Sequence, residues 1–261
     1  TTAGRAFRFE GAVMDGIPVF NLARETLRGV EVTGIRGILN STTQYILAEM
    51  EQGASLDAAL AHMQRLGIAE ADASLDVDGW DAAAKISALA NVLMGAGLTP
   101  ADVDRTGITG LQPDDLRDAV DAGQRLRLLA TARRVEGRVV ARVAPTRVTA
   151  GDLFATLPGM SNAVTFETDL LEDVTIVQGG GGLVQTAYAL LPKLKAANLD
   201  LLFCDMVTYA TSSTFGVLVR ELDVPIVLVA LQPLKAMDYA KATTYMQLSN
   251  DDFCSIPEFA G

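Results

Sequence analysis

Residues 70–85 read EADASLDVDGWDAAAK, an acidic segment that ends in a lysine. Five of its first twelve residues carry carboxylates. Gly79 can open a helix, and in that helix Asp81 and Lys85 occupy positions i and i+4 on one face, with three alanines between them. An aspartate at this spacing stabilises the ammonium form of a lysine. The stretch therefore predicts a lysine that can give a proton to a developing alkoxide.

Carboxylates in the loop before this helix, Glu70 above all, can hold an ammonium group or a hydroxyl of a small polar substrate. A calcium site is a weaker interpretation. The letters SLDVDG at 74–79 resemble the start of an EF-hand loop, but its twelfth position is Lys85, where calcium requires a bidentate glutamate. A third interpretation stays open: the acids suit a solvated loop and a helix N-terminus, where the helix dipole favours negative charge.

The composition predicts a soluble globular protein that acts on small molecules. The 261 residues are 49% hydrophobic and 20% charged, and the net charge of -11 without a Lys/Arg cluster argues against nucleic-acid or membrane-surface binding. No apolar run has the length of a membrane span, and the N-terminus lacks a signal-peptide layout. We therefore expect a cytoplasmic protein, in which Cys204 and Cys254, which have no metal-binding spacing, are reduced thiols.

Hydrophobic periodicity predicts an α+β fold, with a mixed sheet covered by helices. Apolar spacing and end signals predict helices at 18–28, 41–52, 55–66, 79–95 and 113–122. Thr99 before Pro100 is a further helix start. Strands are predicted at 30–39, 127–135, 139–145 and 162–168. Glu136-Gly137 is a plausible hairpin turn between two of these strands.

The character of the sequence changes near residue 190. LDLLFCDM and VPIVLVAL are nearly continuous apolar runs with a helical stretch between them, the pattern of a βαβ unit with a parallel sheet. Residues 1–190 hold fifteen arginines and one lysine, whereas 191–261 hold one arginine and four lysines. We therefore predict two parts, 1–190 and 191–261, that differ in origin.

Several motifs in the first part resemble the catalytic domain of homoserine dehydrogenase, in family-like order and spacing. They are FEGAVMDGIPVF (9–20), GILNSTTQYILAEME (37–51), GIAEADASLDVDGWDAAAK (67–85), NAVTFETD (162–169) and GGGGLVQTA (179–187). The resemblance covers roughly residues 5–190. It implies the interconversion of L-homoserine and L-aspartate 4-semialdehyde with NAD or NADP, a step in threonine and methionine biosynthesis.

The resemblance also assigns roles by motif position. Lys85 becomes the proton donor and acceptor at the substrate oxygen, and the residues that hold the substrate are Glu70, Asp76 and Asp81. The resemblance places Gly67, Gly180 and Gly182 beside the cofactor. It implies a monovalent cation, Na⁺ or K⁺, at Glu10 and the backbone carbonyls of Val13, Asp15 and Ile17, and it implies a homodimer.

The largest departure of the first part from the family is an absence. No strand, G-x-G-x-x-G and helix precede the motifs, although this unit binds the dinucleotide in the family. The glycine run at 179–182 comes late and does not follow a convincing Rossmann strand. We therefore expect this chain to be the catalytic and dimerising portion of a dehydrogenase without its nucleotide domain. We expect that this portion does not oxidise homoserine by itself.

The second part, about 191–261, resembles an internal stretch of the L-arabinose isomerase type of sugar isomerase. No isomerase site can be assigned to it, because that family holds its metal with histidines and glutamates, and the single histidine here is His62. Two alternatives to a dehydrogenase stay open: a non-enzymatic oligomerisation module, and a chimera in which the isomerase fragment is non-functional.

Overall fold

The structure is a computed structural model that describes residues 9–65, 73–180, 194–205, 220 and 222–229. The chain divides into two compact units, Thr1–Gly181 and Gly182–Gly261. Unit 1 contains a six-stranded sheet and its helices, and unit 2 contains a pair of strands. Each unit is described by itself.

The sheet of unit 1 has the strand order β2-β4-β3-β1-β5-β6. Its strands are β1 (Val32–Ile38), β2 (Asp104–Arg105), β3 (Gln124–Val135), β4 (Arg138–Thr149), β5 (Asn162–Thr168) and β6 (Asp173–Gln178). Neighbouring strands are antiparallel except β2 and β4, which are parallel. Strands β3 and β4 form a long hairpin in which Thr131 lies opposite Arg142. Glu136 and Gly137 both have positive φ at its turn, as a type I′ turn requires.

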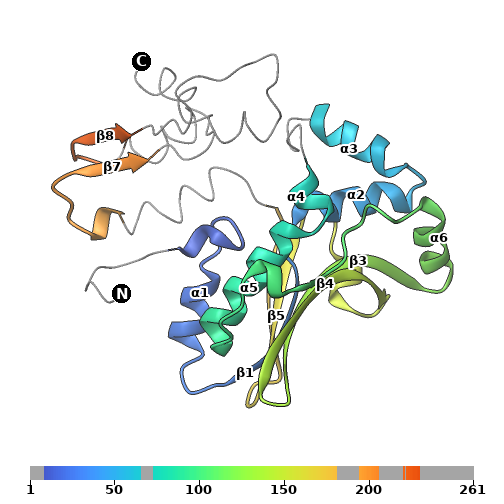
Figure 1. The fold of residues 1–261 in the computed structure, drawn as a ribbon, viewed down its shortest axis with the longest axis horizontal. Coiled ribbons are helices and arrows are strands. Elements are labelled where there is room, and N and C mark those ends of the chain that lie inside the picture. The colour runs from blue at the N-terminus through green and yellow to red at the C-terminus, as the bar shows by residue number, and fades with distance from the viewer. Residues whose placement is uncertain (1–8, 66–72, 181–193, 206–219, 221, 230–261) are drawn as a thin grey trace. The chain divides into compact units, whose positions relative to one another are not determined.

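Helices pack against this sheet (Figure 1). The α-helices of unit 1 are α1 (Val19–Asn21), α2 (Ser41–Glu51), α3 (Leu56–Arg65), α4 (Ser74–Val77), α5 (Trp80–Met94), α6 (Pro113–Asp121) and α7 (Leu153–Thr156). The described part of the unit also contains two short 3-10 helices, η1 (Glu10–Ala12) and η3 (Pro100–Asp102), and the π-helical turn η2 (Leu22–Thr26). The predicted mixed sheet covered by helices is confirmed.

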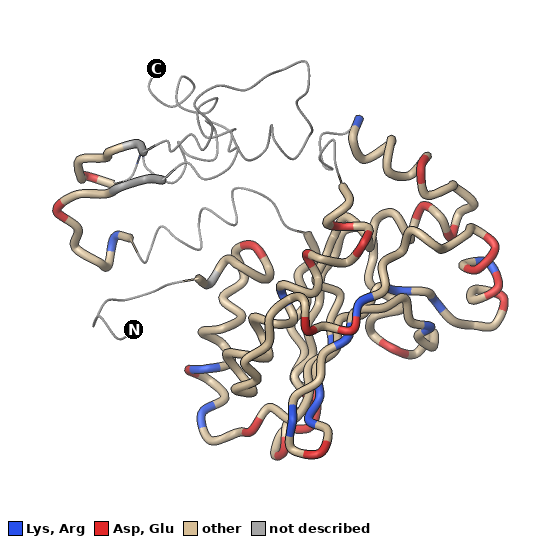
Figure 2. Tube along the Cα trace, viewed as in Figure 1, with Lys and Arg blue, Asp and Glu red and all other residues tan. Residues whose placement is uncertain are grey.

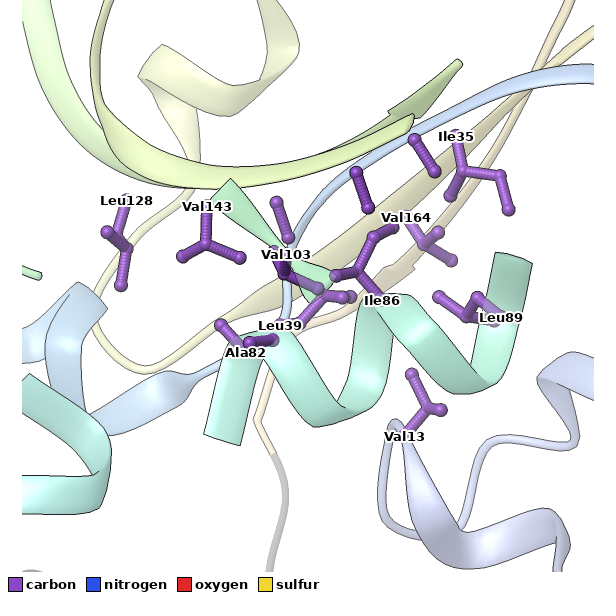
Figure 3. Packing of buried hydrophobic residues seen from close by; sticks show 14 of the residues in the cluster. Val13, Ile35, Leu39, Ala82, Ile86, Leu89, Val103, Leu128, Val143 and Val164 are labelled. Atoms are coloured by element: carbon purple, nitrogen blue, oxygen red, sulfur yellow. The ribbon is translucent and has the colours of Figure 1, made fainter. Parts of the chain in front are cut away.

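The main core lies between α5 and the sheet. Figure 3 shows Ala82, Ile86 and Leu89 of α5 in the cluster that contains Ile35 and Val143 of the sheet, and all five side chains are buried. Burying each large aliphatic side chain contributes roughly 1.5–3 kcal/mol. The buried face of α5, whose residues lie on both sides of Lys85 in the sequence, is therefore anchored to three central strands, β1, β3 and β4.

A smaller core packs on the other face of the sheet. It joins Phe154 and Leu157, at and after α7, to Ile38, Leu129 and Ala163 of three strands. Arginines also lie along β3 and β4 (Figure 2). Two of them pair across strands, Arg133 with Glu167 and Arg142 with Asp104. These two arginines are therefore matched by carboxylates.

The described part of unit 2 contains β7 (Leu202–Asp205) and β8 (Ile226–Val229), which pair in parallel. Both strands and their direction agree with the prediction from the apolar runs. The predicted helix between them lies outside the described residues. Among the described residues, no helix combines the length and the apolar character needed to cross a membrane.

Candidate functional site

The predicted lysine lies one turn inside α5. Gly79 precedes the helix with φ +80°, and the helix begins at Trp80. Lys85 Nζ lies 2.7 Å from Asp81 Oδ2, and the two side chains are 23% and 31% exposed. The same ammonium group donates a hydrogen bond of 2.9 Å to the carbonyl oxygen of Leu39. The charge is thus held at two points while part of the side chain stays accessible to a substrate.

A buried asparagine joins the acidic residues. Asn40 Nδ2 donates to Asp76 Oδ1 at 2.6 Å and to Asp81 Oδ2 at 2.8 Å. Asn40 Oδ1 accepts a hydrogen bond of 2.8 Å from the backbone N–H of Thr43, so the residue is also the N-cap of α2. The end of β1, the start of α2, the single turn α4 and the start of α5 therefore meet at one side chain.

Asp76 carries the one clear electrostatic perturbation in this cluster. Burial raises the pKa of its carboxyl group, the hydrogen bond from Asn40 lowers it, the charge of Asp81 raises it and that of Lys85 lowers it, and the net direction is upward. Two carboxylates and one ammonium therefore share a partly desolvated space. Such a cluster is typical of a functional site, although structural networks also produce it.

A strand end supports the turn that leads into α5. The Arg105 guanidinium stacks 3.8 Å from the centre of the Trp80 ring and donates to the carbonyl oxygen of Asp78. The backbone N–H of Ile108 donates to the carbonyl oxygen of Val77 at 2.8 Å. Cation–π contacts of this kind contribute about 0.5–2 kcal/mol. The segment 105–108 therefore fixes the place from which Asp81 and Lys85 project.

The structure brings together three of the predicted site residues, Lys85, Asp81 and Asp76. Glu70 and Gly67 lie in 66–72, outside the described residues. Gly182 is also outside them, in 181–193. Gly180 follows β6 and is exposed.

The residues of the predicted cation loop lie in and after η1. Glu10 begins η1, Val13 is buried, and Asp15 has φ +40° and accepts from Gln178 Nε2 at 3.4 Å. The Ile17 carbonyl oxygen accepts from the backbone N–H of Val19. Within the described residues, no group of three or more His, Cys, Asp or Glu side chains is placed to hold a metal ion.

The comparisons with known proteins bear on this arrangement. The profile of a family described as homoserine dehydrogenase matches residues 18–194, more than half of the chain. The chain belongs to the homoserine dehydrogenase family. It is 41% identical over 187 residues to the NAD(+)-dependent homoserine dehydrogenase of Pseudomonas canavaninivorans, and 41% identical over 192 residues to the homoserine dehydrogenase of Methanocaldococcus jannaschii. These matches cover 71% and 73% of this chain, and 53% and 56% of the relatives.

Solved homoserine dehydrogenases have a similar fold. The enzyme from Thiobacillus denitrificans matches with a TM-score of 0.68 and 35% identity, over 73% of this chain and 46% of that one. A hyperthermophilic archaeal homoserine dehydrogenase in complex with NADPH matches with a TM-score of 0.59 and 30% identity, over 72% and 55%. The chain thus spans about half the length of the homoserine dehydrogenases it matches.

Asn40 and the Leu39 carbonyl are the site groups that sequence reasoning missed. A signal for Asn40 was present, because asparagine directly before a predicted helix is a preferred N-cap. That signal reports only the bond to Thr43. The bonds to Asp76 and Asp81 join residues 36 and 41 positions apart, and no local pattern in this homoserine dehydrogenase family member encodes them.

Proposed function

We propose that the chain carries the substrate-binding and proton-transfer machinery of a homoserine dehydrogenase, which interconverts L-homoserine and L-aspartate 4-semialdehyde. The observation that carries the proposal is the Lys85–Asp81 ion pair of 2.7 Å, held against the Leu39 carbonyl and placed at the start of α5 in a member of this family. An ammonium group in this position is a general acid within reach of a substrate oxygen.

Lys85 acts on the oxygen that changes between aldehyde and alcohol. When bound, NAD or NADP exchanges a hydride with the carbon that bears this oxygen. In the direction of reduction the oxygen gains a proton from the Lys85 ammonium group, and in the direction of oxidation neutral Lys85 takes that proton back. Asp81 pairs with the ammonium group and fixes its position.

The carboxylates hold the amino end of the substrate. Homoserine carries an ammonium group, and Asp76 with Asp81 presents two carboxylates from adjoining elements, to which Glu70 adds a third in this proposal. Charge-assisted hydrogen bonds to an ammonium are about twice as strong as neutral ones. The acidic stretch at 70–81 is therefore the substrate-orienting part of the proposed site.

The proposed cofactor is NAD or NADP. The 261 residues contain no G-x-G-x-x-G sequence, which marks the phosphate-binding turn of a dinucleotide domain. Gly67, Gly180 and Gly182 are proposed to lie beside the cofactor without holding its phosphates. One relative is named NAD(+)-dependent and one solved structure contains NADPH, so either dinucleotide is compatible with the family.

A bound Na⁺ or K⁺ at Glu10 and the carbonyls of Val13, Asp15 and Ile17 remains part of the proposal. Carbonyl and carboxylate oxygens are the ligands that hard cations prefer. The Ile17 carbonyl already accepts one backbone hydrogen bond, and its second lone pair stays available for a cation. Replacing Na⁺ by choline should then lower the melting temperature of the protein.

The homodimer, the cytoplasmic location and the isomerase-like second part also stay predictions. The homoserine dehydrogenase family match ends at residue 194. A non-enzymatic oligomerisation module is the competing function. It requires a dimer that does not respond to L-homoserine.

Isothermal titration with L-homoserine tests the proposal. The wild-type chain should bind L-homoserine, and Lys85→Ala and Asp81→Asn should each weaken binding by about tenfold or more, the usual effect of losing a bond to a charged group. Lys195→Ala, in unit 2, is the matched control and should bind like wild type. Circular dichroism would confirm that each variant is folded. A folded, dimeric wild-type chain with no heat of L-homoserine binding would favour the oligomerisation module instead.

A further inference from the structure

We infer that Asn40 is a positioning residue that holds the carboxylates of Asp76 and Asp81 together on a single amide nitrogen for the substrate. The inference deepens the proposed function, and only the identity of the substrate rests on that function. The contacts of Asn40 with the two carboxylates are present in this chain whatever its substrate is. Asn40 does not itself reach the reacting atoms.

The orientation of the Asn40 amide is fixed from its oxygen side. Oδ1 accepts from the Thr43 N–H, which is a donor only, so the oxygen must face α2. The NH2 group must then face the opposite way, toward Asp76 Oδ1 and Asp81 Oδ2. The residue is 5% exposed, and a buried amide with this set of partners has one conformation. One side chain thus caps a helix and clamps two carboxylates.

The clamp is needed because the two carboxylates repel each other. Lys85 contacts Asp81, so the positive charge compensates one carboxylate directly and the other only at a distance. The hydrogen bond from Asn40 lowers the pKa of Asp76, whereas burial and the charge of Asp81 raise it. Without the amide donor, Asp76 would take up a proton at a higher pH. A protonated Asp76 cannot attract the ammonium group of a substrate.

The surrounding elements supply Asp76 with no substitute for this amide among the described residues. The charged groups that act on Asp76 are Asp81 and Lys85 of α5. The titratable groups of α2 have other partners: Tyr45 and Glu49 contact His62, and Glu51 pairs with Arg127. On the β2 side, Arg105 donates to the backbone of Asp78 rather than to a carboxylate.

Asn40 could instead matter only as the cap of α2, and the choice of variants separates the two roles. Serine is as good an N-cap as asparagine, but its single hydroxyl, used as acceptor for Thr43, cannot reach two carboxylates. Asn40→Ser therefore removes the clamp and keeps the cap. Asn91→Ser is the matched control. Asn91 lies in the last turns of α5, and the hydrogen bonds of its side chain go to the backbone of Leu98 rather than to a carboxylate.

The decisive measurement is the titration of Asp76 by carboxyl ¹³C NMR in the whole chain, assigned by the signal that Asp76→Asn removes. Asn40→Ser should raise the pKa of Asp76 relative to wild type, and Asn91→Ser should leave it unchanged. An unchanged Asp76 titration in folded Asn40→Ser would overturn the inference, since a cap alone would survive the change. This readout requires neither substrate nor cofactor, so it stands even if L-homoserine does not bind.

The binding profile adds the functional consequence. The affinity of wild type for L-homoserine should fall as Asp76 protonates, and in Asn40→Ser that fall should begin at a higher pH and bring about tenfold weaker binding near the wild-type Asp76 pKa. If wild type fails to bind L-homoserine at any pH while the Asp76 shift is observed, the proposed function fails and the role of Asn40 stands.

Discussion

At the scale of single residues, the site is a cluster of charges whose local spacing could be predicted and whose long-range contacts could not. The i and i+4 rule predicted the pairing of Asp81 with Lys85, because a helix brings those positions together whatever the rest of the fold does. The contact of Asn40 with Asp76 depends on how β1, α2 and α4 pack. Only the tertiary structure determines that contact.

Asp76→Asn should make the protein more stable at neutral pH. The folded-state pKa of Asp76 is raised, chiefly by burial, so its contribution to stability is present below the unfolded value of 3.8 and is lost as the pH rises through the folded value. A neutral asparagine avoids this loss. The expected gain in the free energy of unfolding above that range is on the order of 1 kcal/mol, as for other changes that relieve a functional site.

Urea denaturation of wild type and Asp76→Asn across a series of pH values measures this difference. The two curves should converge as the pH falls below 3.8, because Asp76 is then protonated in both the folded and the unfolded state and is neutral like asparagine. A variant that is less stable than wild type at neutral pH would show that the carboxylate of Asp76 is a net stabilising group. L-homoserine binding should weaken in the same variant, in accord with the trade between stability and function.

At the scale of elements, the long periodic helices, the hairpin and the start of η3 at Pro100 could be predicted, whereas the short helices α4 and α7 and the edge strand β6 could not. Helices α2, α3, α5 and α6 begin and end within two residues of their predicted limits. α4 and α7 have four residues each, too few for a helical period to show. β6 was missed because it is an edge strand with one largely exposed face and an acidic start.

The turn between α4 and α5 predicts a strong effect at a glycine outside the site. A Cβ atom added to Gly107 would lie 2.4 Å from the Val77 carbonyl oxygen and 2.6 Å from Asp78 Cα, both backbone atoms. Gly107→Ala should therefore lower the free energy of unfolding by about 1–3 kcal/mol, the usual effect of overpacking. It should also weaken L-homoserine binding, because the displaced turn leads directly to Asp81.

Gly110→Ala is the matched control for this substitution. A Cβ atom added there would meet nothing within 4 Å. Its stability should stay within about 0.5 kcal/mol of wild type, as for most surface changes. Thermal unfolding of both variants gives the comparison. Equal stabilities would mean that the segment 105–108 yields without strain and does not brace the start of α5.

At the scale of the whole molecule, the chain joins a unit that belongs to the homoserine dehydrogenase family to a second part of different composition. The family match ends at residue 194, and the two compact units divide at Gly181 and Gly182. The change near residue 190 was predicted from composition. That the two parts differ in origin stays a prediction. The strands β7 and β8 could be predicted because each lies in a nearly continuous apolar run, which is typical of a buried parallel strand. Sequence pattern cannot say what a separate unit contributes to binding.

A chain that ends at residue 194 should therefore bind L-homoserine as the whole chain does. Lys85, Asp81, Asp76 and Asn40 all belong to unit 1, and their described partners belong to it as well. Changes at distant, independent sites usually influence each other by no more than about 0.3–0.5 kcal/mol. The dissociation constants of the shortened and the whole chain for L-homoserine should therefore agree within about a factor of two to three. Titration calorimetry on the two chains makes the comparison.

The control is Lys85→Ala in the shortened chain, which should still reduce L-homoserine binding. That result would exclude binding at a new site created by the truncation. If the shortened chain keeps the circular dichroism of a folded α+β unit but loses affinity, then residues 195–261 complete the site, and the second part acts in binding rather than as an appendage.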